Sequence, residues 1–397
     1  MAQSYRIRAR LCREGSYFLF VLLFIIGSAV FRDVNLLYLL AGMMIGPLLF
    51  NWRLVMVNLR KLEFKRQVPD HVCAGETLQV HVSGKNGRRW LDSWAIAVKD
   101  RIEKTAGPML AGDDGASFVT VMLPRISVKQ PSGTNYQLRI TRRGRYRLGP
   151  LSVSTRYPFG LVEGQLQLPL ADELVVFPAL GSLTRHWSHW METDFAGTQN
   201  NARRQGISDG DYYGLREWRS GDSTRWIHWR TSARTGKLSV KQFEQQRGND
   251  IAFLLDLWVP DQPTEEDLGR VEMAVSFAAT IVHDVCQRGR RRLLVTVAGH
   301  EIKQWNDQSS QKLKASILTE LATLQGTSRD KLEEALVRHA AAARPGARRF
   351  VISTRRDRLE SLQPAINDAV AVKMTSELTW LNVGSEQVEH YFRLGNE

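Results

Sequence analysis

The chain has 397 residues, which is enough for two or three domains with separate hydrophobic cores. Its 54 Lys and Arg residues exceed its 41 Asp and Glu residues, and the resulting formal net charge of +13 indicates an anionic neighbour, either lipid head groups or nucleic acid. The three cysteines, Cys12, Cys73 and Cys286, lie far apart without a C-x-x-C pair, which argues against a disulfide framework or a zinc knuckle.

Residues 1–58 predict a basic tail followed by a transmembrane helical hairpin. Two apolar runs place the helices at about 16–31 and 34–52, close to the length that a bilayer core of about 30 Å requires. Basic residues flank both outer ends, whereas the short connection carries only Arg32 and Asp33. The positive-inside rule therefore places the N-terminus and the soluble domains in the cytoplasm, with the hairpin in contact with membrane lipid.

Glycines in this region bear on two further interpretations. Small residues allow close approach of membrane helices, and the hairpin offers Gly27, Gly42 and Gly46. The segment 27–29 also resembles the cleavage site of a signal peptide, which is the alternative to an anchor. We favour the anchor, because a second apolar span follows at once.

Residues 59–180 predict an all-β domain, an antiparallel sandwich of immunoglobulin-like type. Strands with one apolar face are expected at 77–82, 94–98, 118–122 and 136–140, and a closing hairpin at 145–148 and 151–154. The following segment, 181–211, is rich in Gly, Asn, Ser and Arg and predicts a linker with low order.

Residues 250–397 change to the pattern of an α/β domain. Strands are expected at 251–255, 293–297, 349–353 and 378–381, and helices at 265–288, 311–324 and 331–342. Strands that alternate with helices of this length predict a parallel sheet with helices on both faces.

Between these domains lies a segment, 212–249, that is unusually dense in Trp, Arg, Gly and Asp; we call it the signature segment. Asp222 is expected to N-cap a short helix over 223–234 that Gly236 ends. Trp and Arg dominate binding hot spots in protein interfaces. The candidates for partner binding are therefore Trp218, Arg225, Trp229 and Arg234.

The competing interpretation of the signature segment is internal scaffolding, in which the Trp rings pack beneath the sheet. In that case arginines pair with acidic residues of the same segment, Arg216, Arg225 and Arg234 with Glu217, Asp222 and Glu244. Interleaved basic and aromatic residues also suggest nucleic-acid binding, but acidic residues interrupt the run and the membrane flanks explain much of the net charge.

Two motifs resemble those of the bacterial domain of unknown function 58 family. The first runs through the signature segment at Gly214, Arg216, Glu217, Gly221, Asp222, Arg225, Ile227, Trp229, Ser232, Ala233, Arg234, Leu238, Val240, Phe243 and Glu244. The second lies at 142–150 and 157–161, so the resemblance covers about 145–390. Trp218, Ser220 and His228 depart from it, standing where the family often has Tyr, Pro and Asp.

The resemblance implies that residues 250–397 are similar to a von Willebrand factor A domain and that the membrane is a bacterial inner membrane. It also implies a MoxR-type AAA+ ATPase as partner, with a transglutaminase-like membrane protein as a second candidate. Domains of this kind often bind Mg²⁺ through Asp-x-Ser-x-Ser, for which the hard ion needs converging oxygens.

At the corresponding place this chain has Asp256, with Trp258 and Pro260 instead of hydroxyl residues. Asp256 is a candidate metal ligand in a metal-dependent adhesion or hydrolytic domain, although a structural role in capping a turn is favoured. The sequence has no Walker-type loop, H-E-x-x-H or G-x-S-x-G motif. We therefore expect an interaction protein and no enzyme, with no cofactor.

Overall fold

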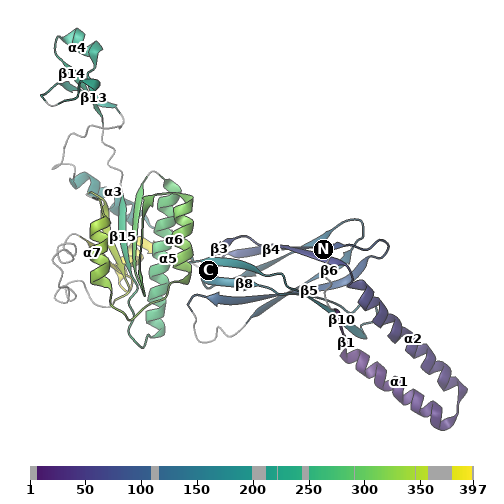
Figure 1. The fold of residues 1–397 in the computed structure, drawn as a ribbon. Helices are drawn as coiled ribbons and strands as arrows, with labels where there is room; N and C mark the ends of the chain where they lie inside the picture. Colours follow the sequence, from purple (N-terminus) through teal and green to yellow (C-terminus); the bar gives the residue numbers. More distant parts are fainter. Residues whose placement is uncertain are drawn as a thin grey trace. The chain divides into compact units, whose positions relative to one another are not determined.

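A computed structural model describes residues 7–108, 116–198, 212–220, 222–243, 250–289, 291–344, 346–355 and 378–395. The chain divides into two compact units, the first made mainly of residues 1–179 and the second mainly of the residues that follow. The first unit contains a helical hairpin and a β-sandwich, and the second contains an α/β domain and the signature segment (Figure 1).

The hairpin consists of α1, Arg13–Arg32, and α2, Asn35–Asn58, and both helices are long and apolar enough to cross a membrane. Only 17% of the apolar window of each helix is buried, unlike the core helix of a soluble protein. Both helices are longer than the sequence predicted. The prediction of close approach at Gly27, Gly42 and Gly46 is wrong, because a Cβ on any of them would meet nothing within 4 Å.

The N-terminal residues before the hairpin also differ from the prediction of a basic tail. Ile7–Leu11 forms strand β1, which pairs antiparallel with β10, Val162–Leu168. Arg8 and Arg10 alternate with Ile7, Ala9 and Leu11, so that the charged side chains leave the sheet on one face. A single residue, Cys12, separates β1 from α1.

Two sheets make up the sandwich. The larger has the order β1-β10-β9-β5-β8-β11-β3, with β6 added on β5, and the smaller has the order β2-β4-β7. The strands not yet given are β2 Leu62–Gln67, β3 His71–Cys73, β4 Thr77–Asn86, β5 Ser93–Ala106, β6 Ser117–Ile126, β7 Ser132–Arg139, β8 Gly144–Leu148, β9 Leu151–Thr155 and β11 Asp172–Phe177. The pair β11 and β3 is parallel, and the other pairs of this unit are antiparallel.

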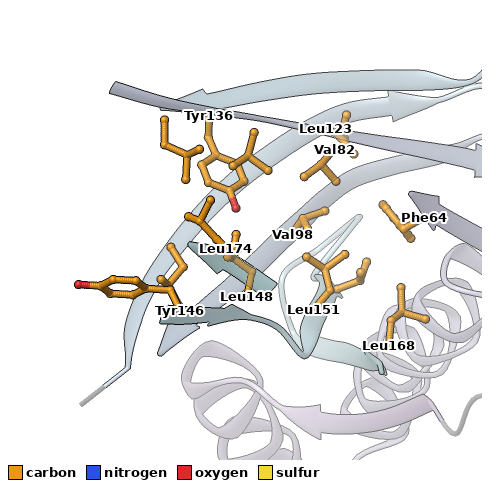
Figure 2. Packing of buried hydrophobic residues seen from close by; sticks show 14 of the residues in the cluster. Phe64, Val82, Val98, Leu123, Tyr136, Tyr146, Leu148, Leu151, Leu168 and Leu174 are labelled. Carbon is orange, nitrogen blue, oxygen red and sulfur yellow. The ribbon is translucent and has the colours of Figure 1, made fainter. Parts of the chain in front are cut away.

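Side chains from both sheets fill the sandwich, and Figure 2 shows Val82 and Tyr136 of the smaller sheet facing Val98 and Leu148 of the larger. One charged cluster lies within this core. Arg66 donates to Asp100 at 2.6 and 2.8 Å, and the Tyr136 hydroxyl donates to the same carboxylate at 2.7 Å. A buried carboxylate is tolerated only with such partners, and these bonds link two strands of the smaller sheet to β5 of the larger.

The segment 181–211 was predicted as a linker with low order, and its first part is ordered instead. Ser182–Leu183 forms β12, which pairs with β20, Phe392–Arg393, and Arg185–Thr198 forms helix α3. Trp187 is 3% exposed and packs edge-on against Phe277 and Phe350. Residues 199–211 lie outside the described residues.

A five-stranded sheet forms the centre of the α/β domain, with the order β17-β16-β15-β18-β19. Its strands are β15 Ile251–Asp256, β16 Arg292–Ala298, β17 Ile302–Gln308, β18 Arg348–Ser353 and β19 Thr379–Asn382. All neighbours are parallel except β16 and β17. The predicted parallel sheet is therefore present, with one antiparallel edge strand.

Helices cover both faces of this sheet (Figure 1). Among the described residues they include α3 and α5 Glu265–Arg288, α6 Gln311–Thr323, α7 Leu332–Ala342 and the short α10 Glu386–Tyr391. Leu254 of β15 packs with Leu336 of α7, whereas its neighbour Phe253 stacks on Phe350 on the side of α3 and α5. This alternation explains why β15 is buried along its whole length.

Candidate functional site

The carboxyl ends of β15 and β18 carry a buried polar cluster at the edge where open α/β sheets bind ligands. Asp256 ends β15 and is 2% exposed. Its Oδ2 accepts hydrogen bonds from the Ser353 hydroxyl at 2.9 Å and from Nε of Arg355 at 2.8 Å. The guanidinium of Arg355 also forms a two-pronged contact with Asp330, at 2.9 and 2.7 Å. Arg355 thus joins two carboxylates.

Trp258, which stands where the metal-binding motif has a hydroxyl residue, contacts this cluster through its ring. The ring of Trp258 lies 5.1 Å from the guanidinium carbon of Arg355, which is a cation–π contact. Burial raises the pKa of the Asp256 carboxyl, and the Arg355 cation opposes that shift. Hydrogen bonds from Arg355 lower the pKa of Asp330.

These contacts bear on the predicted metal site. The guanidinium supplies the positive charge beside Asp256 that a divalent ion would otherwise supply, and Trp258 covers it. Among the residues that the structure describes, no group of three or more His, Cys, Asp or Glu side chains could hold a metal ion. The geometry at Asp256 is that of a structural ion pair.

The signature segment, as far as it is described, folds into a small unit of its own. Strands β13 Tyr212–Glu217 and β14 Ser239–Phe243 pair antiparallel. Between them lie a 3₁₀ turn, η1 Thr224–Trp226, and a short helix, α4 Trp229–Thr235. The buried side chains of this unit are Ile227, Ser232, Ser239 and Val240.

The sequence predicted that Asp222 caps the helix, and this prediction is wrong. In the structure Asp222 pairs with Arg216. The two terminal guanidinium nitrogens of Arg216 each donate to one Asp222 carboxylate oxygen at 2.6 Å, and Asp222 also accepts from the Arg219 backbone amide at 2.8 Å. Hydrogen bonds from Arg216 lower the pKa of Asp222 to about 2. One pair of the scaffolding interpretation is therefore present. Glu217 pairs with Lys237 instead, and Glu244 lies outside the described residues.

His228 caps helix α4 in place of Asp222. Its Nδ1 accepts from the Thr231 backbone amide at 3.3 Å and lies 2.9 Å from the Thr231 hydroxyl. This is the hydrogen bond that an Asp makes at an N-cap, so His228 fills the structural role of an acidic cap. Gly236 ends the helix in the left-handed conformation, with φ of 71°, as predicted.

The four candidates for partner binding lie outside the small core of the signature segment. Trp229 is 65% exposed and Trp218 36% exposed, and Arg225 and Arg234 are exposed as well. They do not form one flat face, because Arg234 follows Trp229 by five positions on the helix, which leaves the two side chains about 140° apart around its axis. Arg225 lies on η1, with its guanidinium 5.7 Å from the Trp226 ring.

Sequence reasoning found Asp256 but missed Arg355, Asp330 and Ser353. The signal for two of them was present, since Ser353 is the last residue of a predicted strand and Arg355 follows it by two positions, close to where Asp256 stands after its own strand. Neighbouring parallel strands bring such residues together at one edge. Asp330 had no comparable signal, because it precedes α7 and also accepts from the Leu332 backbone amide there.

Residues 214–375 match the family described as "Protein of unknown function DUF58". The uncharacterized protein YeaD of Bacillus subtilis (strain 168) is 24% identical over 266 residues, which are 67% of this chain and 58% of YeaD. The chain is thus similar to DUF58 proteins over a region that makes up less than half of its length, and it spans little more than half of YeaD. The match begins inside the signature segment and includes Asp256 and Arg355.

Solved structures resemble parts of the chain only distantly. They include a β-glucosidase from Listeria innocua (14% identity, 29% of this chain and 16% of that one, TM-score 0.20). The CARDB domain of the PF1109 protein from Pyrococcus furiosus covers 29% of this chain and 87% of its own, at 14% identity and a TM-score of 0.16. Such TM-scores support no conclusion about fold or function.

Proposed function

We propose that this protein is a membrane-anchored interaction protein that faces the cytoplasm and acts by binding and not by turnover. Its partner in this proposal is a MoxR-type AAA+ ATPase, with a transglutaminase-like membrane protein as a second candidate, as the family resemblance implies. The α/β domain would act as a von Willebrand factor A-like module that presents the signature segment to the partner.

One contrast carries the proposal. At the carboxyl edge of the sheet, where an α/β fold would bind a ligand, Arg355 is held by Asp256 and Asp330. In the signature segment, by comparison, the large side chain of Trp229 is 65% exposed. Exposed Trp and Arg side chains are the residues that most often dominate binding between proteins.

The hairpin supports the anchoring part of the proposal. Apolar side chains cover its surface, for example Phe24 at 70% and Met43 at 68% exposed, and lipid would bury them. Cationic residues lie at its open end, among them Arg53 and Arg60, whereas the tip has Arg32 beside the compensating Asp33. By the positive-inside rule, this distribution of charge supports a cytoplasmic location for the open end and both units, with the hairpin in a bacterial inner membrane.

The test is affinity purification of the full-length protein from mild-detergent membranes of its own host, with ATP present. The variant carries Arg225→Ala and Trp229→Ala. A matched control carries Arg338→Ala and Leu394→Ala, which remove an exposed arginine and an exposed apolar residue from the α/β domain. Thermal melting checks that both variants fold.

We expect an AAA+ ATPase to co-elute with the wild type and the control but not with the folded double variant. Co-elution with the double variant would contradict the assignment of the signature segment as the binding surface. Absence of an ATPase from the wild-type sample would contradict the proposed partner.

A further inference from the structure

Residues 157–161, the later part of the second family-like motif, form a turn at the base of the hairpin. Leu161 is fixed to both membrane helices: its carbonyl oxygen accepts from the Cys12 backbone amide at 3.0 Å, next to the start of α1. Its own amide and that of Val162 donate to Oδ1 of Asn51 in α2, at 3.1 and 3.0 Å. The turn therefore has a defined position along the axis of the hairpin.

The depth of this turn relative to the bilayer follows from the lengths of the two helices. At about 1.5 Å per residue, a hydrocarbon core of about 30 Å measured from the tip ends near Arg13 on α1 and near Leu54 on α2. Both helices give the same boundary. Asn51 lies one helical turn inside it and Cys12 at it, so the turn that contacts both lies at the edge of the hydrocarbon layer.

The turn exposes aromatic side chains, which are common at the edge of the hydrocarbon layer. Phe159 is 53% exposed and Tyr157 41% exposed, and the ring of Phe159 lies 6.3 Å from that of Phe50 on the apolar surface of α2. Tyr157 stacks on Trp94, which is 41% exposed. Aromatic side chains with one polar end are enriched where a bilayer meets water.

A second exposed element lies slightly farther from the hydrocarbon. Trp90 is 90% exposed and Leu91 54% exposed, in the loop 87–92 between β4 and β5. Arg88 of this loop donates to the Val57 carbonyl oxygen at 2.7 Å, three residues beyond Leu54 on α2. This distance, about 5 Å along the helix, places the contact of Arg88, in the same loop as Trp90, at the level of the lipid head groups.

Resting on the proposed membrane anchoring, we propose that the turn 157–161 and the loop 87–92 insert into the interfacial layer of the leaflet beside the sandwich. The partner of this surface is lipid, because the surface continues directly from the hairpin. Only three residues separate α2 from β2, and one separates β1 from α1. The sandwich is then seated on the bilayer by its own aromatic side chains and is not held away from it by a tether.

Depth-dependent fluorescence quenching tests this inference on the full chain. A variant without Cys12, Cys73 and Cys286 receives one cysteine at a time, Phe159→Cys, Trp90→Cys, Gln167→Cys or Leu23→Cys, and carries the NBD fluorophore there. The protein is placed in nanodiscs of phosphatidylcholine and phosphatidylglycerol in equal amounts, with doxyl groups either near the head group or near the end of the acyl chain. Gln167 is the control, because it is exposed on the same strand that begins at Val162.

We expect the label at Phe159 to have blue-shifted emission and to lose more intensity with the head-group doxyl lipid than the label at Gln167. The label at Leu23, in the middle of α1, is expected to respond most to the acyl-chain doxyl lipid. A label at Phe159 quenched no more than the one at Gln167, while Leu23 is quenched, overturns the inference and leaves the anchoring intact. If Leu23 is not quenched either, the anchoring itself is wrong.

The Trp90 label keeps the test decisive if the Phe159 variant does not fold. Trp90 is almost fully exposed, so its replacement removes little packing within the protein. Quenching of this label by the head-group doxyl lipid supports the inference. Free access of aqueous iodide to it, without quenching by lipid, would overturn it.

Discussion

Arg355 and Asp256 form an ion pair that joins the carboxyl ends of two neighbouring parallel strands, with Nε of Arg355 2.8 Å from Oδ2 of Asp256. Their side chains are 5% and 3% exposed. A buried charge without a partner is much more costly than one in a pair. The pair therefore stabilises this edge of the sheet as long as both members are present.

Asp256→Asn should strongly destabilise the protein, because it leaves the Arg355 guanidinium buried with Asp330 as its remaining carboxylate partner among the described contacts. Loss of one member of a buried pair typically costs about 3–5 kcal/mol. Asp284→Asn is the matched control, since Asp284 pairs with Arg288 on the surface of α5, where such a change costs less than about 1 kcal/mol. Thermal and denaturant unfolding in detergent compares the two. Equal stabilities of the two variants would contradict the role of the pair.

Addition of Mg²⁺ should leave the melting temperature of the wild type unchanged. A ligand that binds only the folded state raises its stability with concentration, and Arg355 already supplies the cation beside Asp256. Thermal melting with millimolar Mg²⁺ or Mn²⁺ measures this directly. A rise in melting temperature that Asp256→Asn abolishes would revive the metal-dependent alternative.

Sequence patterns predicted elements better than they predicted which elements meet. The apolar runs predicted α1 and α2, and strand–helix alternation predicted the α/β sheet. Strand β1 was missed because the arginines at 8 and 10 outweighed the alternation of Ile7, Ala9 and Leu11. Helix α3 was missed because polar residues surround the tryptophans that dock it.

The candidate site shows the same limit. Asp256 was found from its place after a strand, but its side-chain partners Ser353 and Arg355 come 97 and 99 positions later, and only the folded sheet reveals that they lie beside it. The capping role of His228 was equally hidden, since histidine is not among the residues typical of an N-cap.

Acid should weaken the α/β domain through His339 on α7. This side chain is fully buried beside Thr296, with Nδ1 2.9 Å from the Thr296 hydroxyl oxygen, and burial lowers its pKa from 6.5 to about 4. Between these values the unfolded chain binds a proton that the folded domain does not, so stability falls as the pH drops from about 6.5 to about 4. The full effect is about 3 kcal/mol.

Unfolding of the full-length protein at a series of pH values in this window measures the effect. His339→Gln keeps a polar group near Thr296 without a titrating ring, so its stability should depend less on pH over the same range. An unchanged pH dependence in that variant would show that other groups cause it.

Replacing the cap of α4 should loosen the signature segment locally. His228→Ala removes the acceptor for the Thr231 amide, and loss of an N-cap costs about 1 kcal/mol. His228→Asp restores an acceptor and should retain the helix. Hydrogen exchange of the amides in Trp229–Thr235 is the measurement, since the change is confined to one short helix. Equal exchange in the Ala and Asp variants would contradict the capping role.

Gly15→Ala should disturb the junction between hairpin and sandwich far more than Gly27→Ala on the same helix. A Cβ at Gly15 would lie 2.0 Å from the Leu161 carbonyl oxygen, a backbone atom that cannot rotate away. A Cβ at Gly27 meets nothing within 4 Å. Overpacking of this kind costs about 1–3 kcal/mol.

Thermal melting in detergent should therefore show a lower transition for Gly15→Ala and an unchanged one for Gly27→Ala. In nanodiscs the NBD label at Phe159 should also lose part of its quenching by head-group doxyl lipid in the Gly15→Ala background, because Leu161 is displaced from α1. Equal melting and equal quenching in both backgrounds would mean that the contact between Gly15 and Leu161 does not hold the turn against the hairpin.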